Sequence, residues 1–159
     1  MKKNEQHQCR FHFEPVDKAR RSLVHTWLGS PHVAKWFYGQ GLQNTLNHLD
    51  DFLNGDIKGQ YWLGYDENRP FAFLITSSVK KPNDELTKWC AKEGEAITLD
   101  LLIGDVDYLG KGLSHIVIQE FLLNSPYATW RAFRLSQSPG VKRSEKGLYL
   151  LNTPPFPIV

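Results

Sequence analysis

Residues Ile97–Leu123 read ITLDLLIGDVDYLGKGLSHIVIQEFLL, and this stretch decides the fold class of the chain. It starts within the nearly continuous apolar run Ala96–Ile103, in which only Thr98 and Asp100 are polar. Such a run is typical of a strand that is buried on both faces of a sheet. Apolar residues then recur at helical spacing over Gly112–Asn124. We therefore expect a central strand that leads through a glycine loop into a helix, with one apolar side formed by Ile116, Val117, Phe121 and Leu122.

The loop between this strand and this helix comprises Gly104–Leu109 and the sequence Gly110-Lys111-Gly112. Two glycines let the backbone approach a ligand closely, and the first amides of the helix favour phosphate groups. The pattern differs from a P-loop because Lys111 lies between the glycines, and from a dinucleotide fingerprint because a third glycine is missing. Taken alone, the pattern fits an ordinary tight turn equally well.

The rest of the chain supplies the other elements of one layered α+β domain. Asp17 is a helix N-cap, Pro31 can open a second helix, and Asn54-Gly55 ends a third. The alternation and spacing of apolar residues predict strands over 9–14, 60–65, 71–79 and 129–135, helices over 18–27 and 45–53, a turn over 66–70 and a polar loop over 80–94.

Composition excludes several classes of function. The chain has 159 residues, 41% of them hydrophobic, and a net charge of only +2, which predicts no strong field for nucleic acid. We expect neither a membrane span nor a signal peptide, because the sequence has no apolar run of the required length. Cys9 and Cys90 have no ligand spacing, so we expect no metal and a cytoplasmic protein with free thiols.

Three separated segments resemble the GNAT N-acetyltransferases, in particular the aminoglycoside 6′-N-acetyltransferases and their siderophore-biosynthetic relatives. They are VHTWLGSPHVAKWF (24–37), RPFAF (69–73) and LGKGLS (109–114), and the similarity extends over residues 9–125. The resemblance implies a mixed, mostly antiparallel sheet flanked by helices in a single domain. Residues 1–126 would form the acetyltransferase-like part and residues 127–159 an atypical tail of the same domain.

The resemblance also implies a binding site for acetyl-CoA. Backbone groups of three strand residues would bind the pantetheine arm, as an added strand would, and amides of the glycine loop would hold the pyrophosphate. The strand residues are Leu101, Leu102 and Ile103, and the loop residues are Leu109, Gly110, Lys111, Gly112, Leu113 and Ser114. One residue departs from the general family pattern, which has Gln or Arg where this chain has Asp107.

Asp100 is the candidate catalytic residue, because a carboxylate in an apolar strand needs a partner or a function. By resemblance it would bind the acceptor amine or act as its general base, since an ammonium must lose a proton before it attacks a thioester. The alternative is a solvent-facing or ion-paired carboxylate. We expect the acceptor, a small-molecule amine, to contact Asp100 and also Trp36, Phe37, Trp89 and Glu95, although aromatic residues at such spacings are more often part of a core.

After Asn124 the family's tail pattern, NxxAIxxYEKxGF, is missing. Either the tail has diverged or a reading-frame change has replaced it, and translation of the other frames would test this. The family's general-acid tyrosine then has no matched position, and Tyr149 is the nearest candidate by location alone. Loss of the closing strands would expose a sheet edge through which two copies could pair. Three hypotheses stay open: an N-acetyltransferase acting on a small molecule such as an aminoglycoside, a degenerate domain that binds acetyl-CoA without turnover, and a structural protein.

Overall fold

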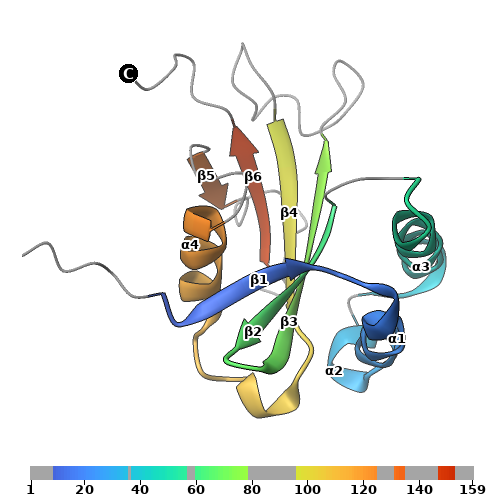
Figure 1. Ribbon diagram of the computed structural model, residues 1–159, viewed down its shortest axis with the longest axis horizontal. Coiled ribbons are helices and arrows are strands. Elements are labelled where there is room, and N and C mark those ends of the chain that lie inside the picture. The colour runs from blue at the N-terminus through green and yellow to red at the C-terminus, as the bar shows by residue number, and fades with distance from the viewer. Residues whose placement is uncertain are drawn as a thin grey trace, which may run out of the picture.

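The computed structural model describes residues 9–35, 37–56, 60–78, 96–124, 131–134 and 147–152. Its centre is a six-stranded sheet in the order β1-β2-β3-β4-β6-β5, and every neighbouring pair is antiparallel (Figure 1). The strands are β1 (Phe11–Pro15), β2 (Tyr61–Asp66), β3 (Arg69–Ser78), β4 (Ala96–Ile103), β5 (Arg131–Arg134) and β6 (Gly147–Asn152).

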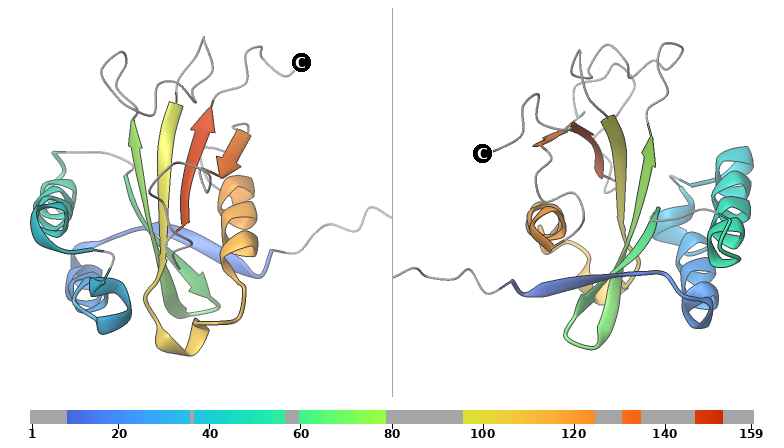
Figure 2. Two further views of the ribbon diagram at one scale, coloured as in Figure 1. Left: turned by 180° about the vertical axis from the view of Figure 1, so that it is seen from behind. Right: turned by 45° about the horizontal axis from the view of Figure 1, so that its top comes forward.

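Helices cover both faces of this sheet, as the two views of Figure 2 show. Three of them pack on one face and the fourth packs on the other, so that the sheet has a separate apolar core on each side. The three are α1 (Arg21–Leu28), α2 (Pro31–Ala34) and α3 (Gly39–Leu53), and the fourth is α4 (Ser114–Asn124). This α+β arrangement in a single domain confirms the fold class expected from the sequence.

Strand β4 is the central strand that the sequence predicts, with the same bounds. It pairs with β3 over Ile97–Ile103 and with β6 over Ala96–Leu101. Leu99 and Leu101 belong to the core under α4, whereas Leu102 belongs to the core under α1, α2 and α3. Because side chains alternate along a strand, Asp100 shares the second face with Leu102. The half-buried carboxylate therefore lies on the side of the sheet that α3 covers.

The first helices follow the capping signals of the sequence. The Asp17 carboxylate accepts a hydrogen bond from the Arg20 amide at 2.9 Å and caps a short 3-10 turn, η1 (Lys18–Arg20), which continues as α1. Pro31 is the first residue of α2, as predicted. Helix α3 begins at Gly39, six residues before the predicted start. The sequence does not indicate this start, because the N-cap residue Tyr38 makes no side-chain hydrogen bond to the first turn.

Two details of α4 differ from the prediction. The helix begins at Ser114 because Gly112 has a φ of 65°, which is incompatible with a right-handed helix. Its buried residues are Val117, Ile118 and Phe121, whereas Ile116, expected on the apolar side, is 41% exposed. Only six of the eleven residues of α4 are apolar, and they are spread around the helix, so the pattern could not fix which side faces the sheet.

The hairpin turn and the tail also differ from expectation. The turn between β2 and β3 contains only Glu67 and Asn68, so that Arg69 already lies in a strand. The tail supplies β5, within the predicted strand 129–135, and β6, which was not expected. The expectation that the closing strands are lost is therefore wrong, and the outer strands of the described sheet are β1 and β5. None of the helices in the described ranges is long and apolar enough to cross a membrane.

The carboxylate of Asp66, at the end of β2, joins three segments of the chain. It pairs with the Arg10 guanidinium at 2.7 Å and accepts a hydrogen bond from the Tyr108 hydroxyl at 3.1 Å. The hydrogen bond from Arg10 is the main reason that the pKa of Asp66 lies below its ordinary value. Asp66 in its ionised form therefore stabilises the folded state.

We expect acid to destabilise the protein partly through Asp66. A carboxyl group whose pKa is lower in the folded state stabilises the fold above its unfolded-state pKa, and this contribution is lost as the pH falls through the folded-state pKa. The free energy of unfolding in urea should therefore fall more in the wild type than in Asp66→Asn between about pH 5 and pH 2. Asp56→Asn, at an exposed residue after α3, is the control. An equal fall in wild type and Asp66→Asn would contradict this role.

Candidate functional site

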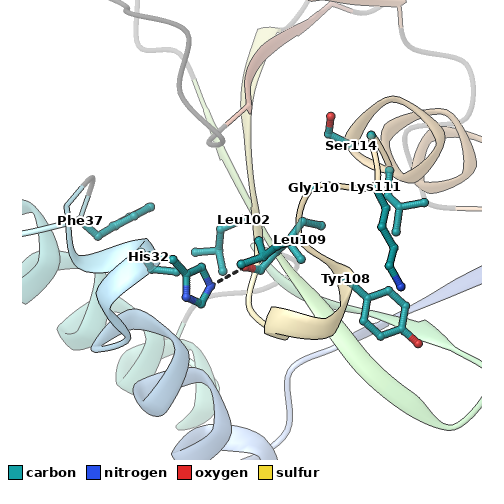
Figure 3. Close-up of a pocket in the computed structure, with 12 residues that line it drawn as sticks. His32, Phe37, Leu102, Tyr108, Leu109, Gly110, Lys111 and Ser114 are labelled. Carbon is teal, nitrogen blue, oxygen red and sulfur yellow. Dashed lines mark hydrogen bonds between the residues drawn. The ribbon is translucent and has the colours of Figure 1, made fainter.

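A cavity of about 210 Å³ lies between α2 and the glycine loop (Figure 3). We call it the loop cavity. One side is formed by α2 and the segment after it, the floor by the end of β4, and the other side by the loop and the start of α4. Its lining residues are His32, Val33, Phe37, Leu102, Ile103, Tyr108, Leu109, Gly110, Lys111, Gly112, Leu113 and Ser114.

The backbone of the glycine loop is built to expose amides. Gly110 and Gly112 have φ values of 69° and 65°, which side chains rarely adopt, and a Cβ at either position would meet nothing within 4 Å. The glycines are therefore required by the conformation of the loop, and their faces are open. The first amides of α4 have no partner within the helix and carry the positive end of its dipole. Together these groups form a site that can bind a phosphate.

Lys111 lies beside this site, but its ammonium group is directed to a tyrosine. The Lys111 Nζ atom lies 5.6 Å from the centre of the Tyr108 ring, on the side away from His32 and Phe37 (Figure 3). The Tyr108 ring in turn stacks on Phe71, with 4.6 Å between the ring centres. Lys111 therefore lines the loop cavity while its ammonium group lies at the Tyr108 ring.

Arg69 neutralises two carboxylates in the first part of the loop, before Gly110. Its guanidinium binds Asp105 at 2.7 Å and Asp107 at 2.6 Å, and it lies over the Tyr108 ring. The pKa of Arg69 is raised, mainly by the hydrogen bond to Asp107 and then by that to Asp105. Asp107, the residue that departs from the family pattern, thus fixes the 3-10 turn η3 (Val106–Tyr108) to the β2–β3 hairpin.

Arg69→Met should therefore weaken the binding of an anionic ligand in the loop cavity. The change leaves two carboxylates without their cation beside a phosphate site, and we expect the dissociation constant of acetyl-CoA to rise about fivefold at low salt. The difference should shrink at about 1 M salt, where such charges are screened. Titration calorimetry of Arg69→Met and of the double variant with Asp107→Asn checks this. The double variant should recover part of the affinity, and equal affinities of all three proteins would refute the electrostatic role.

Two contacts hold the end of β4 where it enters the loop. A Cβ placed on Gly104 would overlap the ring of Trp27, so the backbone of Gly104 lies directly against that ring. The Nε2 atom of His32 lies 3.0 Å from the carbonyl oxygen of Ile103, as the dashed line in Figure 3 shows. Both contacts come from the α1–α2 segment, so this segment determines where the floor of the loop cavity lies.

A second cavity, of about 290 Å³, lies between α3 and the sheet. We call it the α3 cavity. Among its described lining residues Asp100 is the only carboxylate, and burial raises the pKa of the Tyr61 hydroxyl to about 12, so Tyr61 is a neutral phenol near pH 7. The lining residues are Phe37, Tyr38, Gly41, Leu42, Asn44, Thr45, His48, Tyr61, Ile75, Ser77 and Asp100. Among the described lining residues, the Asp100 carboxylate and the His48 imidazole are the groups whose chemistry suits a general base.

The two cavities adjoin. Phe37 lines both of them. Leu102 in the loop cavity and Asp100 in the α3 cavity are two residues apart on the same face of β4, which places them roughly 7 Å apart along the strand. A ligand that extends from the glycine loop along β4 would therefore end close to Asp100.

The structure brings most of the predicted site residues together. Leu102, Ile103 and the six loop residues from Leu109 to Ser114 line the loop cavity, and Phe37 and Asp100 line the α3 cavity. Leu101 lines neither, because its side chain is buried under α4 and its backbone position pairs with Gly147. Three predicted residues, Trp36, Trp89 and Glu95, lie outside the described part of the chain. Within that part, no group of three potential metal ligands occurs.

A family model described as an acetyltransferase (GNAT) domain matches residues 18–134. An aminoglycoside N(6′)-acetyltransferase from Legionella pneumophila subsp. pneumophila is similar in structure, with 31% sequence identity and a TM-score of 0.64 over 94% of this chain and 95% of that chain. No curated protein matches the chain in sequence.

More distant structures share the fold. An uncharacterized protein from Bacillus halodurans has 20% identity and a TM-score of 0.59, and the match covers 90% of this chain and 83% of that chain. The structure of AAC(6′)-Ib in complex with ribostamycin and coenzyme A has 16% identity and a TM-score of 0.58, with 90% and 93% covered. From the family model and the Legionella structure together, the chain belongs to the GNAT acetyltransferase family.

Proposed function

We propose that this protein transfers the acetyl group of acetyl-CoA to a primary amine of a small molecule. The observation that carries the proposal is the pair of adjoining cavities on one face of β4, one at an anion-binding loop and the other at a carboxylate, with Phe37 between them. Each cavity matches the chemistry of one substrate.

The loop cavity is suited to the donor. Amides from Gly110 to Ser114 would hold the pyrophosphate of acetyl-CoA, whereas the Leu109 amide, expected among them, already donates to the Val106 carbonyl at 3.2 Å. In the described part of the chain the pairing of β4 with β6 ends at Leu101 and Gly147, so Leu102 and Ile103 lie beyond the last described pair. The pantetheine arm, which has two amide groups, would bind the backbone there as a short added strand does.

The α3 cavity is suited to the acceptor. An amine that is protonated in water must lose a proton before its nitrogen attacks the thioester carbonyl. Asp100 would hold the ammonium group and take up that proton, directly or through a water molecule. The carbon–nitrogen bond then forms and the carbon–sulfur bond breaks. CoA leaves as a thiolate, which takes up the second proton that the nitrogen releases when it becomes an amide.

An aminoglycoside is the acceptor class that we favour. The Legionella protein is by its description an aminoglycoside N(6′)-acetyltransferase, and AAC(6′)-Ib is described in complex with ribostamycin. The α3 cavity also suits a hydroxyl-rich amine, since Asn44, Thr45, His48 and Ser77 line it with neutral or weakly basic polar groups and Asp100 supplies one negative charge.

Two measurements test the proposal. Titration calorimetry with acetyl-CoA tests the donor site, and release of CoA thiol in the presence of a panel of amines tests transfer. The panel should contain neomycin and paromomycin, which differ only in an amine or a hydroxyl at the 6′ position, and spermidine as a polyamine without a sugar. Thiol release with neomycin alone supports transfer to the 6′ amine, and release with both supports another amine of the same class.

Release with spermidine alone would keep the transfer but exclude the aminoglycoside as acceptor. Two other outcomes oppose the proposal. Binding of acetyl-CoA without thiol release for any amine would favour the alternative, a domain that binds acetyl-CoA without turnover. Absence of acetyl-CoA binding would remove the proposal as a whole.

A further inference from the structure

We infer that His32 is a positioning residue for the acyl donor. Its Nε2 atom lies 3.0 Å from the carbonyl oxygen of Ile103. A carbonyl oxygen can only accept a hydrogen bond, so Nε2 carries the hydrogen and donates it. His32 lies on α2 and Ile103 ends β4, so this bond joins two walls of the loop cavity.

The direction of the Ile103 peptide gives this bond its significance. The amide of Gly104 donates to the Phe71 carbonyl in β3 at 2.8 Å. In an antiparallel sheet, the N–H and C=O groups of one residue point to one neighbouring strand and those of the next residue point to the opposite side. Because Gly104 points toward β3, the N–H and C=O groups of Ile103 point away from β3. On that side, among the described residues, the pairing with β6 reaches only as far as Leu101. The backbone groups of Ile103 therefore face the position that an added strand would occupy.

Helix α2 is packed against the core, so His32 can hold the Ile103 peptide in place. Val33, the next residue, is 4% exposed, and its amide donates to the Ser30 carbonyl at 3.0 Å. The backbone of Gly104, one residue after Ile103, rests on the Trp27 ring. His32 and Trp27 thus fix the end of β4 from one direction, whereas Arg69 fixes η3 and the loop from another.

His32 and Arg69 should therefore affect the binding of different parts of acetyl-CoA. This inference rests on the proposed binding of acetyl-CoA in the loop cavity. His32 should affect mainly the pantetheine arm, which would pair with the backbone of Ile103. The pyrophosphate should depend on the loop amides and thus on Arg69. The role of His32 is to orient a backbone group, so it differs from that of Asp100.

Titration calorimetry on the whole chain measures the dissociation constants of two ligands. Acetyl-CoA contains the arm, and 3′-phospho-ADP is the nucleotide part of CoA without it. His32→Phe keeps a ring but has no donor, and it should weaken acetyl-CoA binding about 5- to 20-fold while changing 3′-phospho-ADP binding less than about twofold. His32→Gln, which keeps an N–H donor, should recover most of the affinity.

A matched control is available on β1. His12 is exposed and stacks on Tyr65, with 4.9 Å between the ring centres, and a phenylalanine can keep this contact. His12→Phe should change neither probe. If His32→Phe does not fold, as judged by circular dichroism, His32→Asn replaces it, because its shorter side chain withdraws the donor from Ile103.

Three results would overturn the inference. Unchanged acetyl-CoA binding by His32→Phe would show that the bond does not position the donor. An equal loss for both probes would show a general effect on the fold of the site. Failure of His32→Gln to recover affinity would show that the ring, not the hydrogen bond, is what matters. Failure of the wild type to bind either probe would instead remove the proposed function.

Discussion

Asp100→Asn is expected to lower kcat/KM for acetyl transfer by about 10²- to 10⁴-fold, the usual contribution of a general base. The dissociation constant of acetyl-CoA should stay within about twofold of the wild-type value, since Asp100 lines the α3 cavity and not the loop cavity. Stopped-time assays of CoA thiol release, together with titration calorimetry, separate the two effects.

The physical reason lies in the state of the acceptor. At neutral pH a primary amine is almost entirely protonated, and an ammonium nitrogen has no lone pair with which to attack. Asparagine has nearly the same shape as aspartate but can neither accept the proton nor offset the positive charge. The loss should therefore be smaller at about pH 9 than at pH 7, because more of the amine is already neutral at the higher pH.

His48 provides the comparison that makes this test specific. It lies on α3 and lines the same cavity, and its imidazole is the other described lining group that could act as a general base. If Asp100 is the base, His48→Gln should change mainly the KM of the amine, as expected for a group that contacts a substrate hydroxyl. The reverse result, a large loss of kcat in His48→Gln with little change in Asp100→Asn, would transfer the role of the base to His48.

The parts of the fold that could be predicted are those with a strong local signal. Strand β4 has the predicted bounds because an apolar run flanked by polar residues leaves little choice. Asp17 and Pro31 mark helix starts through local backbone geometry. The glycine loop was predicted because its conformation demands glycine at two positions with positive φ.

The rest of the site depends on contacts between distant residues. Arg69 reaches residues 36 and 38 positions away, and His32 reaches one 71 positions away. No periodicity in the sequence records such pairs. The position of Phe37 between the two cavities likewise follows from the placement of α2 and α3 on the sheet, which a local pattern cannot give.

Gly104→Ala is expected to lower both the stability of the fold and the affinity for acetyl-CoA. The added Cβ would overlap the ring of Trp27, which is 7% exposed and packed in the core under α1, α2 and α3. Either the ring or the end of β4 must move, and such overpacking costs about 1–3 kcal/mol. We expect the free energy of unfolding in urea to fall by about that amount. The dissociation constant of acetyl-CoA should rise at least about tenfold, because the floor of the loop cavity shifts with β4.

The same substitution elsewhere gives the control. Gly29→Ala follows α1 in the same segment, and its Cβ would lie 3.6 Å from the nearest atom, the His25 carbonyl oxygen, which is ordinary contact. It should change neither stability nor binding by a measurable amount. If Gly104→Ala behaved like Gly29→Ala, the close approach of Gly104 to Trp27 would not control the site.

A double variant shows whether the clash itself is the cause. Trp27→Leu alone should destabilise the protein by leaving a cavity in the core, and Gly104→Ala alone by overfilling the same space. When the two are combined, the smaller side chain makes room for the added methyl group. The loss of stability in the double variant should therefore be smaller than the sum of the two single losses, by about 1 kcal/mol or more, which is the non-additivity expected of residues in direct contact. Recovery of acetyl-CoA affinity in the same double variant would show that the Trp27 ring sets the position of β4 at the donor site, and additive losses would show that Gly104 acts independently of it.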